Sequence, residues 1–218
     1  MSQTGRMQPM PRDIPIIFSA PMVRALLDGR KAQTRRILKP QIVCHTGPVP
    51  AFTWGKFSGL YPDDWFGYGN AIDGALPCAV GDRLWVREAH AFMPKTAYAL
   101  PKAISPADPD MAAYYREGFD RSGKIIWRPS IHMPRWASRI TLEVTEVRIQ
   151  RLQEISGEDT IVEGVQCPTC EAMKYSACHD SGCFHSLQLF KELWNGLHGP
   201  DAWAANPWVA AISFKRIT

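Results

Sequence analysis

The chain has 218 residues, of which 45% are apolar and 21% are charged, and it contains eight tryptophans. This composition fits one ample domain with a sizeable core, with or without large insertions, and it excludes a wholly disordered chain. The formal net charge of +4 permits a polyanionic partner without requiring one, so the placement of the basic residues matters more than their number.

The sequence pattern does not indicate a membrane or secreted protein. No apolar run approaches the roughly 20 residues that a membrane-spanning helix needs. The first residues lack the apolar segment of a secretory signal. We therefore expect a cytoplasmic protein without a membrane partner.

The N-terminal part predicts a strand, a helix and a second strand. Residues 1–12 are polar and are expected to form a flexible arm. Residues 14–19 are an apolar run typical of a strand. Residues 20–29 place apolar side chains at helical spacing and end at Gly29, a common helix C-cap. Residues 34–40 predict the second strand.

The middle of the chain contains one clear strand between two irregular insertions. Residues 80–92 begin with a Gly-Asp turn and then alternate apolar and charged side chains, which predicts a strand. Residues 41–79 are rich in glycine, proline and aromatic residues and are expected to be an ordered insertion. Residues 92–135 form a second insertion, in which residues 111–119 predict a short helix.

The C-terminal part predicts two strands and two helices. Residues 135–152 alternate apolar and polar side chains, as a half-buried strand does. Ser156 is a suitable N-cap for a helix that carries acidic residues in its first turn and ends at Gly164. Residues 186–197 have the pattern of an amphipathic helix, and residues 206–217 predict the last strand.

Together these elements predict an α+β fold in a single domain, residues 13–218. About five to six strands, broken by short helices and long excursions, fit a small mixed β-barrel better than a doubly wound sheet. A third insertion, residues 165–185, separates the two C-terminal helices.

The segment GRKAQTRR gathers basic side chains around one threonine. It is a solvated turn after a helix, a site where the amine of Lys31 takes a proton from Thr34, or a nucleic-acid contact. The second interpretation needs the pKa of Lys31 to be lowered by burial or by cations, and Arg30, Arg35 and Arg36 are such neighbours. It also needs a third group, usually a carboxylate, that handles protons or orients the pair.

Four segments, in their order along the chain, resemble the ASCH domain of the PUA-like superfamily, and especially its longer members encoded by phages and prophages. The segments are GRKAQTRR, GDRLWVRE, ITLEVTEVRIQRLQEISGEDTIVEGV and NPWVAAISFKRI. The resemblance implies a small PUA-like β-barrel with short flanking helices. The insertions make this chain longer than the compact members of the family.

The ASCH family includes small bacterial amidohydrolases that release acetate from N(4)-acetylcytidine with a lysine and a threonine in the same K-x-x-T motif. By this resemblance, Lys31 would activate Thr34 as the nucleophile on an amide carbonyl. Glu163, on the helix after a strand, would assist proton transfer or bind the transition state. From the residues alone, Glu163 is a helix-terminal carboxylate that the helix dipole disfavours. No organic cofactor is expected.

Other members of the family are proposed to bind or cut RNA. A non-catalytic module that binds RNA or a modified base, and a ribonuclease, are therefore the alternatives to an amidohydrolase. Arginines beside aromatic residues can hold phosphates and stack bases. The candidate contacts to a nucleic acid or modified nucleoside are Arg30, Arg35, Arg36, Arg87, Trp85 and His132.

The third insertion contains a cluster of cysteines. Four thiolates are the number that a tetrahedral structural zinc ion needs, and a Cys-x-x-Cys pair is a common half-site. The predicted zinc ligands are Cys167, Cys170, Cys178 and Cys183. His179 or His185 is a possible substitute for one of the later cysteines, and unligated thiols are the alternative. The zinc ion would stabilise an insertion that lacks a core of its own.

Overall fold

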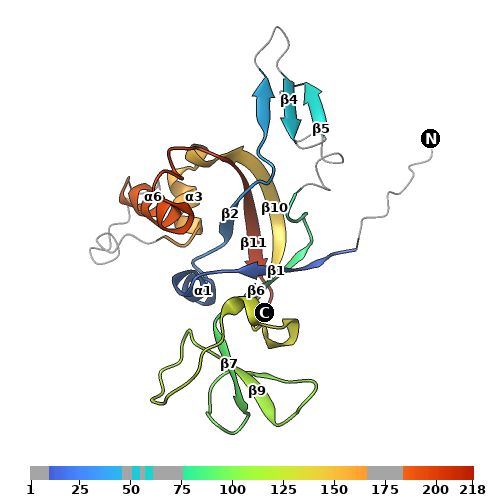
Figure 1. The fold of residues 1–218 in the computed structure, drawn as a ribbon, viewed down its shortest axis with the longest axis vertical. Coiled ribbons are helices and arrows are strands. Elements are labelled where there is room, and N and C mark those ends of the chain that lie inside the picture. The colour runs from blue at the N-terminus through green and yellow to red at the C-terminus, as the bar shows by residue number, and fades with distance from the viewer. Residues whose placement is uncertain (1–9, 46–50, 55–56, 61–75, 166–183) are drawn as a thin grey trace, which may run out of the picture.

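The computed structural model describes residues 10–45, 51–54, 57–60, 76–165 and 184–218 (Figure 1). These residues form three β-sheets and a small number of helices, which confirms the α+β class. Among them, no helix is both long and apolar enough to span a bilayer.

The largest sheet contains five strands in the order β1-β6-β10-β11-β2. β1 and β6 are parallel, and the other neighbours are antiparallel. Within the described residues β1 and β2 are the two edges, so strand pairing leaves this sheet open. The strands are β1 (Asp13–Ile17), β2 (Gln33–Ile37), β6 (Arg83–Arg87), β10 (Thr141–Arg151) and β11 (Trp208–Arg216).

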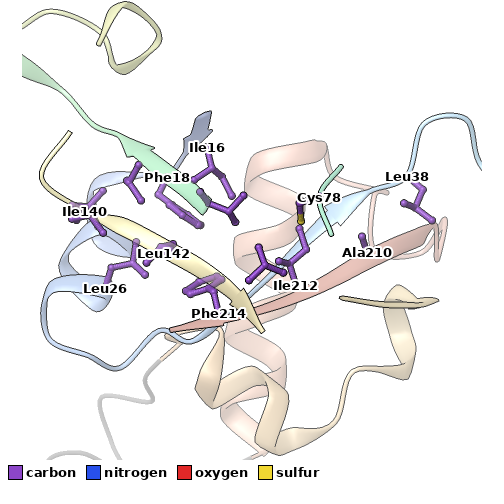
Figure 2. Close-up of a cluster of buried hydrophobic side chains, with 14 of the residues drawn as sticks. Ile16, Phe18, Leu26, Leu38, Cys78, Ile140, Leu142, Ala210, Ile212 and Phe214 are labelled. Atoms are coloured by element: carbon purple, nitrogen blue, oxygen red, sulfur yellow. The ribbon is translucent and has the colours of Figure 1, made fainter. Parts of the chain in front are cut away.

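Helix α1 (Ala20–Leu27) connects the two edge strands and contributes to the main hydrophobic core. Val23 and Leu26 are buried there, together with Leu142 of β10 and Ile212 of β11 (Figure 2). Gly29 follows the helix with φ +74°, as its predicted role at the C-terminal end requires. The chain then turns directly into β2.

Two smaller sheets lie at opposite ends of the molecule (Figure 1). One falls within the predicted first insertion. The other lies in the second, except that its first strand begins at residue 90, inside the single strand predicted for residues 80–92, which is in fact two strands in different sheets. The strands of the first are β3 (Val43–His45), β4 (Ala51–Trp54) and β5 (Phe57–Leu60). Those of the second are β7 (His90–Pro94), β8 (Ala103–Ile104) and β9 (Met111–Tyr115).

The short helix expected at residues 111–119 is wrong, because its first half is strand β9. This strand pairs with both β7 and β8, and Ala112, Ala113 and Tyr114 are fully buried. The two alanines favour a helix locally, but pairing on both sides satisfies the backbone of a central strand and buries its small side chains.

Helices α3 (Gly157–Val162) and α6 (Phe184–His198) lie side by side next to β2 and β11 (Figure 1). The hydroxyl of Ser156 accepts a hydrogen bond from the backbone N–H of Asp159 at 3.0 Å, which confirms the predicted N-cap. A second hydrophobic cluster holds these helices to the chain, and it includes Leu152, Phe190, Trp194 and Val209. Short 3-10 helices connect the other elements, namely η2 (Ser130–His132), η3 (Arg135–Ala137) and η4 (Leu152–Glu154).

Candidate functional site

A cavity of about 390 Å³ opens between β2, α6 and the junction of β1 with α1. One wall is apolar and aromatic and comes from α6. The other is polar and basic and comes from β2 and the turn before it. The lining residues are Ile17, Phe18, Ser19, Met22, Lys31, Thr34, Arg35, Arg36, Ser130, Glu163, Phe190, Leu193, Trp194, Leu197 and His198.

Lys31 stands at the point where three elements meet. Its backbone N–H donates to the carbonyl of Ala25 in α1, at 3.1 Å. The N–H of the next residue, Ala32, donates to the carbonyl of Val162 at the end of α3, at 2.8 Å. These hydrogen bonds dock the C-terminal end of α3 against the turn before β2, and they bring Glu163 to Lys31.

The ammonium group of Lys31 makes three short hydrogen bonds. Its Nζ lies 2.9 Å from Oε2 of Glu163, 2.7 Å from the carbonyl oxygen of Glu163 and 2.7 Å from that of Gln33. The side chains of Lys31 and Glu163 are only 2% and 5% exposed. The structure therefore places two of the predicted catalytic residues in direct contact, although 132 positions separate them in the sequence.

Thr34 lies on the adjoining strand and lines the same cavity. Its antiparallel partner in β11 is Ile212, so Thr34 shares a sheet face with this core residue. Thr34 is only 5% exposed, and its hydroxyl forms no hydrogen bond with any residue in the described part of the chain. This hydroxyl is the one candidate nucleophile in the predicted catalytic set, and no hydrogen bond joins it to Nζ of Lys31, the predicted base.

Arg35 lies on the opposite face of β2 and holds Glu163 in place. Its Nη1 donates to Oε1 of Glu163 at 2.9 Å and to Oε1 of Gln33 at 2.6 Å. Its Nη2 donates to Oδ2 of Asp159 at 2.5 Å, and Arg148 reaches the other oxygen of that carboxylate at 3.1 Å. The side chain of Arg35 is fully buried, so it orients a carboxylate and is not open to a nucleic acid.

Sequence reasoning missed Gln33, Asp159 and Arg148 as parts of this network. A signal for two of them was present. Asp159 precedes Glu163 by four residues and so lies on the same face of the helical turn. Gln33 precedes Arg35 by two residues and so lies on the same face of the strand.

The pKa of Lys31 is lowered from its ordinary value of 10.5. Burial of the ammonium group is the largest cause, and the charges of Arg36 and Arg35 add to it, whereas Glu163 acts in the opposite direction. A lowered pKa makes the neutral amine, which can accept a proton, more accessible. The three hydrogen bonds of the ammonium group oppose this change, because the neutral amine donates only two.

Arg36 shares the face of Thr34 and also lines the cavity. Its Nη2 donates to the carbonyl of Ile17 at 2.7 Å. Phe18 lies close to two cations, with its ring centroid 5.3 Å from Cζ of Arg36 and 5.4 Å from Nζ of Lys31. The electron-rich face of the ring stabilises both charges.

The remaining predicted contacts lie outside the cavity lining. Arg30 forms an ion pair with Asp28 at 2.8 Å. Arg87 lies over the ring of Trp85, with its Cζ 4.6 Å from the centroid, and donates to the carbonyl of Ile131 at 3.2 Å. His132 is exposed at the end of η2.

In the sequence, nothing beyond an ordinary amphipathic pattern indicated that α6 would form a wall of a cavity. The rings of Trp194 and His198 lie 4.4 Å apart at the C-terminal end of the helix, and Phe190 continues the aromatic surface. The pKa of His198 is lowered by burial, with smaller contributions from the charges of Arg36 and Lys39. Periodicity predicts which side chains are apolar but not that they face a cavity.

The predicted zinc ligands Cys167, Cys170, Cys178 and Cys183 lie outside the described residues, as does His179. Within the described ranges, no group of three or more histidine, cysteine or acidic side chains could hold a metal ion. Burial raises the pKa of the Cys78 thiol to about 12, so this cysteine stays a neutral member of the core.

Comparisons with protein-family models, with curated proteins and with solved structures returned no match for this chain.

Proposed function

We propose that this protein is a PUA-like ASCH-type hydrolase that cleaves the amide of an N-acylated nucleobase or nucleoside. One observation carries the proposal: the contact of Lys31 with Glu163, 2.9 Å from Nζ to Oε2, in a cavity that Thr34 also lines. An amine, a hydroxyl and a carboxylate in one hollow are the groups that acyl transfer requires.

The chemistry would run through an ester of Thr34. The neutral amine of Lys31 takes the proton of the Thr34 hydroxyl as its oxygen bonds to the acyl carbon. The carbon–nitrogen bond then breaks, and the ammonium group of Lys31 returns the proton to the departing nitrogen. Water hydrolyses the ester and releases the carboxylic acid. Glu163 stabilises the ammonium form of Lys31 between the two proton transfers.

The dimensions and walls of the cavity support a planar ligand. Its volume of about 390 Å³ is within the usual range for small-molecule sites. Phe190 and Trp194 on α6, only 3% and 4% exposed, form part of its lining opposite the polar groups of β2. A base held there would present its acylated amine toward Lys31 and Thr34.

The test is release of acetate from N(4)-acetylcytidine by the purified protein. Lys31→Met and Thr34→Ala are expected to lower kcat/KM by about 10²–10⁴-fold, because each removes a group that acts in the transition state. Thr34→Ser keeps a hydroxyl and is the matched control, which should retain most of the activity. Thermal unfolding of each variant verifies that it is folded. Undiminished turnover by Lys31→Met would contradict the proposal, as would the absence of turnover in the unmodified protein.

A second candidate is a non-catalytic module that binds RNA or a modified base. Arg87 and Arg135 both lie over the ring of Trp85, with Cζ atoms 4.6 Å and 5.9 Å from its centroid. Trp85 is only 7% exposed, so the arginines, and not the ring, are available for a nucleic acid. Such arginines contact phosphates and give salt-dependent affinity.

The two candidates predict different results with RNA. A binding module gives affinity that falls with salt and that weakens in Arg87→Gln, without acetate release. RNA cleavage that Lys31→Met abolishes would instead identify a ribonuclease.

A further inference from the structure

The cavity lining includes a cation, Arg36, that forms no ion pair with any carboxylate of the described residues. The charge of Glu163 raises the pKa of Arg36, but burial, the larger influence, lowers it. Within the described residues its guanidinium makes one hydrogen bond, from Nη2 to the carbonyl of Ile17 at 2.7 Å. The other N–H groups of this guanidinium have no acceptor in the described part of the chain, although Arg36 lines the cavity.

The neighbouring carboxylates are already engaged. Glu163 is shared by Lys31 and Arg35, and Asp159 is shared by Arg35 and Arg148. Arg148 also pairs with Glu146 at 3.6 Å, so three carboxylates serve three cations, and Arg36 is a fourth cation beside them. The cavity is therefore electropositive, and a group of negative charge is the complement it lacks.

The charge of Arg36 acts across the whole cavity. It contributes to the lowered pKa of Lys31 on the polar wall and to that of His198 on the α6 wall. An anion placed beside Arg36 would offset this repulsion at both groups. Lys31 and His198, in addition to Arg36, would then favour binding of the anion.

We propose that the ligand of this cavity carries an anionic group, which Arg36 binds through the N–H groups that the protein leaves unused. This inference rests on the proposed function and narrows its substrate to a charged N-acylated compound. Arg36 and Thr34 are two residues apart on the same face of β2, so their Cα atoms are about 7 Å apart. The anion therefore lies close to the acyl group that is attacked, either as a phosphate on the nucleotide or as a carboxylate on the acyl chain.

The first measurement compares cytidine with cytidine 5′-monophosphate by calorimetry and does not depend on turnover. We expect the monophosphate to bind about 10–100-fold more tightly, as a charge-assisted hydrogen-bonded pair does. Arg36→Met should reduce this preference to near unity, and Arg36→Lys should keep part of it. Arg24→Met is the matched control, because Arg24 is exposed, pairs with Glu117 and lies outside the cavity lining, so the preference should persist.

The second measurement locates the anion. Turnover of N(4)-succinylcytidine is compared with turnover of N(4)-acetylcytidine in the same set of proteins. A preference for the succinyl compound that depends on Arg36 assigns the anion to the acyl chain, and a preference for the monophosphate assigns it to the nucleotide.

Several results would overturn the inference. Equal affinity for cytidine and its monophosphate, together with no preference for the succinyl compound, is one. A preference that survives in Arg36→Met is another, and the absence of binding to cytidine and to its monophosphate is a third. An Arg36-dependent preference for the monophosphate without any acetate release would sustain the inference while it refutes the proposed hydrolysis.

Discussion

Two opposing influences act on the protonation state of Lys31. Burial and the charges of Arg35 and Arg36 favour the neutral amine, whereas Glu163 and two carbonyl oxygens favour the ammonium. Because the net direction is a lowered pKa, protonated Lys31 is a cost to folding. That cost falls as the pH rises above the pKa of Lys31 in the folded state. The free energy of unfolding therefore increases with pH up to about 10.5, the ordinary pKa of lysine.

The pH dependence of hydrolysis tests this balance. If the neutral amine of Lys31 is the base, kcat/KM rises with pH and has its inflection below 10.5. Arg36→Met removes a cation that lowers the pKa, so the inflection should move to higher pH. The pH profile of kcat/KM for both proteins is the measurement, with Arg24→Met as the control that should not shift. An inflection at the same pH in Arg36→Met would show that the titrating group is not Lys31.

At the scale of the element, the contact between α3 and the turn before β2 decides whether Glu163 reaches Lys31. Gly164 ends α3 with φ +86°, a conformation that L side chains rarely adopt. A methyl group at this position would lie 3.0 Å from Cβ of Ala25 and 3.1 Å from Cβ of Lys31. This glycine therefore allows the close approach that assembles the site.

Two glycine substitutions distinguish the stability cost of crowding at Gly164 from the cost of a left-handed backbone conformation alone. Gly164→Ala should lower the free energy of unfolding by about 2–4 kcal/mol, because the left-handed conformation and the crowding both add cost. Gly29→Ala, at φ +74° with nothing within 4 Å of the added methyl group, should lose only about 1–2 kcal/mol. Urea unfolding of both variants measures the difference. Equal losses of unfolding free energy in the two variants would mean that Gly164 is needed only for its left-handed backbone conformation and not for the close approach.

On the scale of the whole molecule, segments distant in the sequence assemble the cavity. β1, α1 and β2 supply one side, Glu163 follows the end of α3, and α6 supplies the aromatic wall. The central sheet aligns them, since β11 pairs with both β2 and β10. Any change that separates α3 or α6 from the sheet should therefore affect the whole site.

The cysteine cluster lies in the sequence between α3 and α6, two elements that contribute to the cavity. We predict about one zinc ion per chain, lost in a Cys167→Ser, Cys170→Ser double variant, together with a lower melting temperature. Elemental analysis and thermal unfolding are the measurements. Cys78→Ser, a change at a buried core cysteine, is the control that should keep the metal. A metal-free preparation that is fully folded would reject the prediction.

Periodicity and capping predicted most of the elements that carry the site. α1 with Gly29, α3 with Ser156 and the amphipathic α6 lie where these local patterns place them. Strand β10 begins at Thr141, six residues later than predicted, because residues 135–137 form the 3-10 helix η3. The pattern failed at β9, where pairing with β7 and β8 outweighs the helical preference of its alanines. The small sheet of β3, β4 and β5 was not predicted either, because its segment has no regular alternation.

The sequence by itself determined most of the secondary structure that carries the site, because local spacing is a property of neighbouring residues, and a resemblance to a known family suggested Lys31, Thr34 and Glu163 as a candidate set. Only the tertiary structure decided that Arg35 is buried against Glu163, that Arg36 has no acidic partner in the described chain, and that α6 closes the cavity. The reason is physical: the partner of a charge depends on which distant elements the fold brings against it, and no local pattern records that contact.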